Sequence, residues 1–311
     1  MDLELPEVEI QKIAPLAAEQ EALLDSHSVL NVLNVLAGEL AMLGLCLEDN
    51  PDMFPTSLRH CQDYAEGLRS AEKARECAES TDRYADRIEE ELAAMCNRHS
   101  KRLSEPKVIE SLRSLHGIIG ILRLRAKELR IRSQNPDRWE AYPPASLRSS
   151  FSQVFSAMEG FSHGRFRIVN SPFVKGPRDY FIELDFDARP ERQIWMPSVF
   201  VDVMRDLIAN ARKYTPPGGW IVASLHQDPN ELKFSVQDSG RGIPESEIPR
   251  VVEFGHRASN AEDVRSLGGG FGLTKAFTVT RRFGGRFWIA SKEGVGTRVR
   301  ICIPRPDFAR N

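Results

Sequence analysis

The sequence changes character near residues 133–145, and this change limits how the chain can fold. Residues 13–132 are rich in Leu, Ala, Glu and Arg, a composition that favours long helices. After the change, Gly, Phe and β-branched residues become more frequent, and strand-like runs are separated by helical patterns. A chain of 311 residues is also long enough for two domains. We therefore predict a domain at residues 1–135 and a second at residues 140–311.

The first domain is predicted to contain a hairpin of two long antiparallel helices. One helix spans about residues 17–48, and the turn Asn50-Pro51-Asp52-Met53-Phe54-Pro55-Thr56 separates it from a second that runs from Ser57 to about Asn97. A third helical stretch, residues 107–132, has no obvious role in such a hairpin. Tyr142-Pro143-Pro144 then marks the linker between the domains.

The second domain is predicted to be an α+β layer, with one mixed sheet covered by helices on one face. The strand candidates are short runs rich in β-branched and aromatic residues. They are Phe166–Val169, Phe181–Phe186, Trp220–Leu225, Leu232–Gln237, Gly285–Ala290 and Arg298–Ile303.

Charge and hydropathy exclude several classes of partner. The 42 Lys and Arg residues nearly balance the 44 Asp and Glu residues, so no global field favours nucleic acid or an acidic membrane. We find no run of about 18–20 apolar residues that would span a bilayer, and the acidic start Met1-Asp2-Leu3-Glu4 is unlike a signal peptide. The five cysteines form no C-x-x-C pair, which argues against a zinc site or a disulfide framework. We expect a cytoplasmic protein without a nucleic-acid or membrane partner.

Polar residues at helical spacing form the first candidate site in the second domain. Asp206 and Asn210 are four residues apart in a predicted helix and therefore share a face. A carboxylate one turn from an amide oxygen suits a hydrated Mg²⁺, and Lys213 can neutralise phosphate. Taken alone, the segment is more typical of a solvated helix face.

Two glycine-containing segments follow. Asp238 ends a strand candidate, where its carboxylate can accept a hydrogen bond from an adenine amino group, and Gly240 and Gly242 permit tight turns after it. The run Gly268-Gly269-Gly270-Phe271-Gly272 opens a helical pattern and can present amide groups and the positive end of a helix dipole to phosphates. Taken alone, the first segment is compatible with a simple turn and the second with a flexible hinge.

In this order and spacing, the three segments resemble the N, G1 and G2 boxes of the GHKL ATPase superfamily, and specifically the ATP-binding domain of histidine kinases. The resemblance covers about residues 145–305, includes Phe254 at the F box, and ends in the turn Gly294-Val295-Gly296-Thr297. It implies an α/β sandwich of the GHKL (Bergerat) type that binds ATP and Mg²⁺.

By this resemblance, Asn210 binds the metal, Asp238 binds adenine, and residues 255–267 form a lid. Tyr214 and Phe271 wall the base pocket. The phosphate loop is Gly268, Gly270 and Gly272; Lys213, Gly240, Gly242 and Thr297 complete the nucleotide site. Asp206 stands where histidine kinases commonly carry Asn and related ATPases a Glu base. Whether it orients water, assists proton transfer or positions the metal remains open.

The first helix carries the candidate phosphoacceptor. At 100° per residue, His27, Asn31, Asn34 and Gly38 form one stripe, while Val29, Val32, Leu33 and Leu36 spread over the far side. Such a helix can bury an apolar face and leave the imidazole accessible. His116 is the reserve candidate. Alternatively, His27 packs inside a helix bundle and has no catalytic role.

The stripe resembles the phosphoacceptor H box of a histidine-kinase dimerisation domain, in which two helices per subunit pair into a four-helix bundle. The resemblance implies a homodimeric, soluble histidine kinase whose phosphohistidine at His27 passes to an aspartate of a response-regulator receiver domain. Asn31 sits where phosphatase-competent members of the family orient a hydrolytic water.

Ser28, Val32 and Asp206 depart from the family pattern, which usually has an acidic residue, proline and Asn, respectively, at these positions. A kinase-deficient phosphotransferase, scaffold or response-regulator phosphatase is therefore the alternative function. An anti-sigma-type serine kinase would share the ATP domain but would not need the long helical half.

Overall fold

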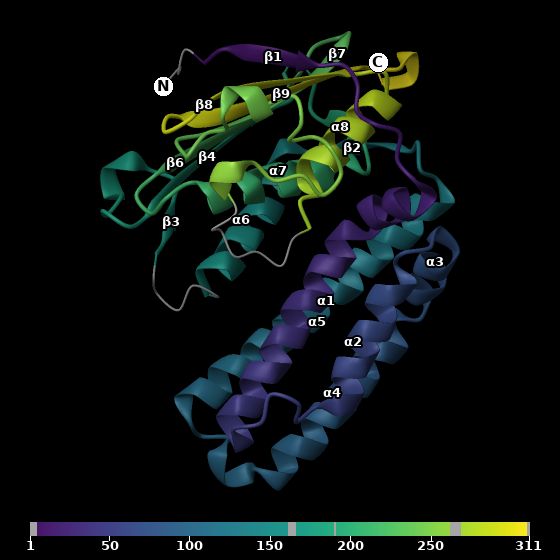
Figure 1. Ribbon diagram of the computed structural model, residues 1–311, viewed down its shortest axis with the longest axis vertical. Coiled ribbons are helices and arrows are strands. Elements are labelled where there is room, and N and C mark those ends of the chain that lie inside the picture. Colours follow the sequence, from purple (N-terminus) through teal and green to yellow (C-terminus); the bar gives the residue numbers. More distant parts are fainter. Residues whose placement is uncertain (1–4, 161–165, 190, 262–268, 310–311) are drawn as a thin grey trace. The chain divides into compact units, whose positions relative to one another are not determined.

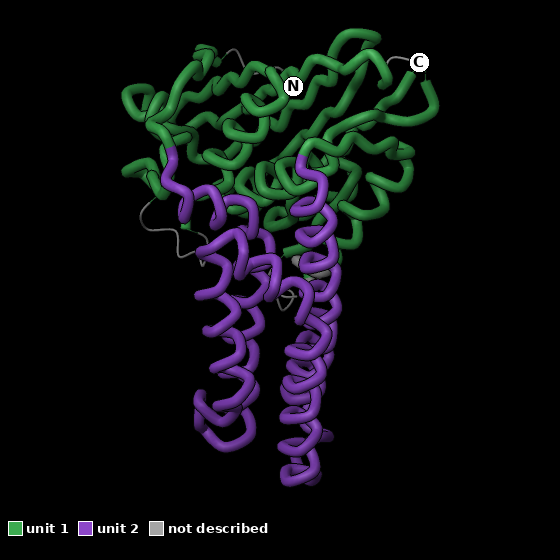
Figure 2. Tube along the Cα trace, turned by 90° about the vertical axis from the view of Figure 1, so that its right-hand side faces the viewer, with its two compact units in different colours: residues 1–15, 137–311 green, residues 16–136 purple. Residues whose placement is uncertain are grey.

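The computed structural model describes residues 5–160, 166–189, 191–261 and 269–309. The chain divides into two compact units (Figure 2): Leu16–Pro136 forms one, and Met1–Pro15 with Asp137–Asn311 forms the other. The start of the chain thus differs from the expected domain at residues 1–135, because the segment before Leu16 folds with the second unit.

Five α-helices make up the helical unit, whose residues are all described (Figure 1). They are α1 (Ala18–Glu48), α2 (Pro55–Gly67), α3 (Ala71–Glu79), α4 (Thr81–Arg98) and α5 (Pro106–Gln134), with a 3₁₀ turn at Ser100–Arg102 before α5. The single helix expected over residues 57–97 is therefore three helices. Its first break follows Gly67, where an added Cβ would lie 2.7 Å from Cys77 Sγ, and its second falls at Ser80.

The principal partner of α1 is α5, which lies beside it in Figure 1. Leu36, Leu40 and Leu43 of α1 are fully buried, as are Leu115 and Ile119 of α5. Burying each such side chain contributes about 2 kcal/mol relative to leaving it exposed. With 31 and 29 residues, these are the longest helices of the unit, so each can cover the apolar stripe of the other. The helix unexplained by the two-helix hairpin is thus a core element.

Among the described residues, α1 is also long and apolar enough to cross a membrane by length and composition. This differs from the expectation that no segment qualifies. Polar residues interrupt the apolar run of α1, namely His27, Asn31, Asn34 and Glu39. They do not lower the mean hydropathy of the helix enough to rule out a membrane span by this criterion. A core helix of a bundle meets the same criteria.

The second unit is built on a seven-stranded sheet in the order β1-β8-β9-β7-β6-β4-β3. Pairing is antiparallel from β1 to β6 and parallel between β6, β4 and β3. The strands are β1 (Glu7–Ile10), β3 (Ile168–Val169), β4 (Tyr180–Asp187), β6 (Trp220–Gln227), β7 (Glu231–Asp238), β8 (Arg286–Lys292) and β9 (Gly296–Pro304). All six strand candidates from the sequence lie in this sheet.

Three further strands were not expected from the sequence. They are β1 and the antiparallel pair β2 (Trp139–Tyr142) and β5 (Ile194–Pro197). Each has only four residues, too few for an alternating pattern to stand out.

Helices α6 (Pro144–Gly160), α7 (Phe200–Tyr214) and α8 (Gly272–Arg282) lie along one side of the sheet (Figure 1). Ile221, Ala223 and Leu225 of β6 alternate with less buried neighbours and are completely buried. One face of the sheet therefore carries the core under the helices, as the mixed-sheet prediction requires. Short 3₁₀ turns occur at Pro172–Val174, Glu245–Glu247, Ser259–Ala261 and Asp307–Ala309.

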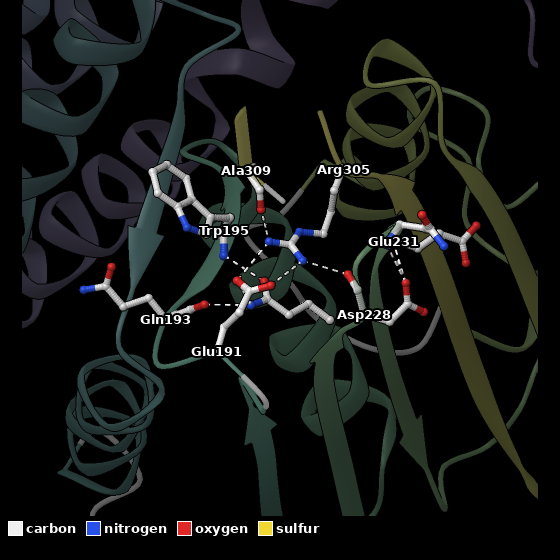
Figure 3. A network of polar contacts seen from close by, with 9 residues as sticks. Glu191, Gln193, Trp195, Asp228, Glu231, Arg305 and Ala309 are labelled. Atoms are coloured by element: carbon white, nitrogen blue, oxygen red, sulfur yellow. Dashed lines mark hydrogen bonds and ion pairs between the residues drawn. The ribbon is translucent and has the colours of Figure 1, made fainter. Parts of the chain in front are cut away.

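A buried guanidinium joins three separate segments of this unit (Figure 3). Arg305, with no exposed surface, donates to both carboxylate oxygens of Glu191 at 2.8 and 3.0 Å and to the carbonyls of Asp228 and Ala309. Gln227 donates to the same carboxylate and accepts from the backbone N–H of Trp195. The C-terminal turn, the β6–β7 turn and β5 are held together here.

Candidate nucleotide-binding site

Helix α7 presents a polar column toward α8. Asp202, Asp206 and Asn210 lie at four-residue spacing and therefore on one face of the helix. Asp202 is buried, whereas Asp206 and Asn210 are partly exposed. The expected pair of Asp206 and Asn210 thus occupies the accessible part of the column.

The amide of Asn210 packs against the first residue of α8. A Cβ added to Gly272 would lie 2.7 Å from Asn210 Nδ2, so any larger residue there would displace the Asn210 amide. The predicted metal residue and the last glycine of the predicted phosphate loop are therefore adjacent. The start of α8 also brings its unpaired backbone N–H groups to this place.

Asp238 ends β7 inside a pocket of backbone donors. Its Oδ1 accepts a hydrogen bond from the Gly240 N–H at 2.8 Å, and the Thr297 N–H on the neighbouring strand also donates to the carboxylate. Burial raises the pKa of Asp238 to about 7, and the two backbone hydrogen bonds oppose that rise. A buried carboxyl group that titrates near neutrality is typical of a ligand site.

The turn after Asp238 packs against the end of α7. Arg241 N–H donates to the carbonyl of Tyr214 at 3.1 Å, and a Cβ on Gly240 would lie 2.7 Å from that same carbonyl oxygen. Gly242 has φ +66°, and a Cβ there would overlap the carbonyl of Lys292. Both glycines are thus required by the backbone, as predicted from the sequence.

Lys213 and Tyr214 at the end of α7 contact each other. Lys213 Nζ lies 3.0 Å from the Tyr214 hydroxyl and 4.6 Å from the centre of its ring. The lysine is partly exposed next to the Asp238 turn, where its charge can meet an anion.

Phe271 stacks on Phe254, with ring centres 4.6 Å apart and an angle of 26° between the rings. The F-box residue and the glycine loop are therefore in direct contact. Gly270 has φ +78°, which again favours glycine. Gly268 lies outside the described residues, as does the predicted lid from residue 262 onward.

The sequence analysis missed one buried charged residue beside the site. Lys275 of α8 is 1% exposed and lies 3.4 Å from Asp202 and 3.5 Å from Asp206. Its only sequence signal is a cation in a helical segment that otherwise presents apolar residues such as Leu273 and Phe277.

His27 and Asn31 belong to the helical unit. The imidazole is 5% exposed, in contrast to the expected accessible ring, and its Nε2 lies 3.1 Å from Asn31 Nδ2. Since an amide nitrogen can only donate, Nε2 accepts this hydrogen bond and the ring proton resides on Nδ1. His116 is exposed, with Nδ1 2.7 Å from the carbonyl of Leu112.

The donor set fits a nucleotide better than a metal held by protein alone. Among the described residues there is no group of three or more His, Cys, Asp or Glu side chains that could bind a metal ion. Mg²⁺ usually takes one or two protein oxygens and completes its shell with water and substrate phosphates. Asp206 and Asn210 beside a glycine-started helix match that pattern.

Comparisons with known proteins cover the part of the chain that contains this site. Residues 197–307 match the family of histidine kinase-, DNA gyrase B- and HSP90-like ATPases. The sensor histidine kinase WalK of Bacillus subtilis is 34% identical over 130 residues, which cover 41% of this chain and 19% of WalK. The adaptive-response sensory kinase SasA of Synechococcus elongatus is 33% identical over 116 residues, covering 35% of this chain and 30% of SasA.

A solved structure, that of the mycobacterial sensor histidine kinase MprB, is 30% identical and covers 40% of this chain and 85% of that chain, with a TM-score of 0.34. The chain spans less than a third of the length of WalK and of SasA. Residues 197–307 of this chain therefore carry a domain of the histidine kinase-, DNA gyrase B- and HSP90-like ATPase type, similar to parts of the sensor histidine kinase WalK and of the sensory kinase SasA.

Proposed function

We propose that this protein is a histidine kinase that transfers the γ-phosphoryl group of ATP to His27 and then to an aspartate of a response-regulator receiver domain. The observation that carries this proposal is the convergence of Asn210, Asp238 and Gly272 in a domain homologous to sensor histidine kinases. The helix with His27 supplies a nucleophile in the same chain.

Each group has a defined task in this proposal. The ionised carboxylate of Asp238 accepts a hydrogen bond from the adenine amino group, and the start of α8 binds phosphate oxygens through backbone N–H groups. Lys213 neutralises phosphate charge. Bound Mg²⁺ would neutralise developing charge on the phosphates, and Asn210 with Asp206 would hold its hydrated shell.

His27 supplies the attacking nitrogen. For Nε2 to attack, Asn31 must release its hydrogen bond and the buried ring must become accessible. Catalysis would then depend mainly on positioning and charge neutralisation.

We further propose that the protein acts as a cytoplasmic, soluble homodimer whose helical units associate into a four-helix bundle. Support comes from a row of exposed apolar side chains on α1, formed by Val35, Met42 and Leu45, on the helix face opposite the buried leucines. In this proposal the buried leucines pair α1 with α5, and the exposed row remains available to a second subunit.

The alternative is a kinase-deficient member that acts as a phosphotransferase, scaffold or response-regulator phosphatase. The contact between Asn31 and His27 favours it, because this hydrogen bond occupies the lone pair that would attack ATP. In a phosphatase, the Asn31 amide would instead orient the water that attacks an aspartyl phosphate.

Incubation of the purified chain with γ-labelled ATP and Mg²⁺ tests the two functions. For a kinase, we expect an acid-labile label in the wild type that is absent from His27→Ala and Asn210→Ala, while His116→Ala is labelled normally. An Asn31→Ala variant that is labelled at least as fast would fit release of Nε2. ATP binding without any label in the wild type would instead favour the alternative, and a phosphorylated receiver domain would be the next substrate.

A further inference from the structure

The most unusual charged residue beside the nucleotide site is Lys275. It lies in the first turn of α8, between Gly272 and Phe277, and its side chain is 1% exposed. An unpaired ammonium group in such a place would cost several kcal/mol of folding free energy. Its presence therefore requires counter-charges, and α7 supplies them.

Two carboxylates of α7 face the lysine. Lys275 Nζ is 3.4 Å from Asp202 Oδ2 and 3.5 Å from Asp206 Oδ2. Asp202 is also 2.7 Å from Arg205 Nη1. Acidic and basic groups of α7 thus meet the buried ammonium group of α8 in one cluster.

The cluster continues into the nucleotide site. Along α7, Asp202 lies one turn before Asp206, which lies one turn before Asn210. Along α8, Lys275 lies one turn after Gly272, which contacts Asn210. Asp206 is 14% exposed and so connects the buried end of this polar column with its accessible end.

We propose that Lys275 is a positioning residue whose ammonium group holds the Asp206 carboxylate in place on the face of α7 that carries Asn210, so that Asp206 accepts hydrogen bonds from the water shell of a nucleotide-bound divalent cation. This inference rests on the proposed nucleotide site.

Removal of the lysine should loosen the side chain of Asp206. Asp202 keeps its contact with Arg205, whereas Asp206 loses the ion pair that ties its carboxylate to α8. A carboxylate that is held less firmly is a poorer acceptor for a hydrated cation, because its orientation must be fixed when the cation binds.

The test is the ratio of the ATP dissociation constants without and with Mg²⁺, measured by calorimetry at a single pH. The ratio cancels the contribution of Asp238, which acts on adenine in both conditions. For Lys275→Met we expect a ratio about tenfold lower than that of the wild type and close to that of Asp206→Asn, because the variant loses the contact that holds the acceptor in place.

Lys275→Arg should keep the wild-type ratio, and Lys275→Gln replaces the methionine variant if that variant does not fold. Phe277→Leu, a buried substitution in the same helix, should lower thermal stability without changing the ratio. A folded Lys275→Met or Lys275→Gln variant with the wild-type ratio would overturn the inference and leave a purely structural ion pair. A wild type that binds no ATP would instead refute the proposed nucleotide site.

Discussion

At the scale of single residues, Asp238 shows how burial prepares a group for a ligand. Its carboxyl group is almost fully enclosed, and its pKa of about 7 means that about half of the molecules carry the proton at neutral pH without nucleotide. The folded protein binds this proton more tightly than the unfolded chain does, where the pKa is 3.8. The resulting stabilisation is complete below the unfolded pKa and is lost as the pH rises through about 7.

ATP binding should therefore release a proton at neutral pH. The adenine amino group donates to the ionised carboxylate, so the nucleotide lowers the pKa of Asp238 and affinity should rise several-fold between about pH 6 and about pH 8. Calorimetry in buffers of different ionisation enthalpy would detect the proton. Asp238→Asn should bind more weakly and show neither effect. Proton-free, pH-independent binding by the wild type would contradict this assignment of Asp238.

Arg305 lies away from the nucleotide site and is expected to affect stability alone. Arg305→Met would leave Glu191 and two backbone carbonyls without their guanidinium donor, at a cost of about 3 kcal/mol in the free energy of unfolding. Urea unfolding followed by tryptophan fluorescence measures it, because all four tryptophans, at positions 139, 195, 220 and 288, lie in the second unit. Arg189→Met, at a surface pair, is the control; equal effects of the two changes would refute a special role for the network.

At the scale of elements, β1 ties the start of the chain to the ATP-binding unit. It pairs with the outer edge of β8, and its residues alternate between two environments. Glu7 and Glu9 pair with Arg300 and Arg286, respectively, and these guanidinium groups lower the pKa of both glutamates. Ile10 is buried in the core. Few residues separate β1 from helix α1, so both ends of the helical unit connect along the chain to the second unit.

A substitution in β1 should therefore lower the stability of the second unit, although the rest of that unit begins only at Asp137. Ile10→Asp places a carboxylate in the core and should lower the free energy of unfolding of the second unit by about 2–4 kcal/mol. Tryptophan fluorescence during urea unfolding reports it. Glu9→Gln, which removes only an exposed pair, should cost less than about 1 kcal/mol. An unchanged midpoint in Ile10→Asp would mean that β1 does not contribute to the stability of the sheet.

At the scale of the whole molecule, the proposed dimer depends on the exposed row of α1. Val35 and Met42 are seven residues apart, and Leu45 follows three residues later, a spacing that keeps apolar side chains on one helix face. These residues continue the stripe of His27 and Asn31 along the same helix.

Met42→Glu combined with Leu45→Glu should therefore shift the wild-type dimer toward monomer in sedimentation experiments. The charges would be placed against a second subunit, whereas in a monomer they would remain in water. Ala18→Glu, on an exposed position at the start of α1, should leave the dimer unchanged. A monomeric wild type, or a double variant that still dimerises fully, would refute this interface.

The local pattern of the sequence was sufficient to predict much of the secondary structure of the second unit. Six strands could be placed from β-branched and aromatic runs, and Gly240, Gly242 and Gly272 could be assigned to turns and close approaches. Asp238 and Asn210 could be proposed as ligand-binding residues, because the chemistry at a strand end or on a helix face depends on nearby residues. Both lie within residues 197–307, which match the ATPase family.

Contacts between distant residues were decided only by the tertiary structure. The partner of α1 is α5 because burial along the full length of two helices depends on which lengths match, which no local pattern encodes. The strand β1 pairs with a segment about 280 positions away, and Lys275 meets Asp206 only because α8 packs on α7. Spacing along the chain therefore determined the elements and the identity of the candidate groups, whereas packing determined their partners, their burial and their charge state.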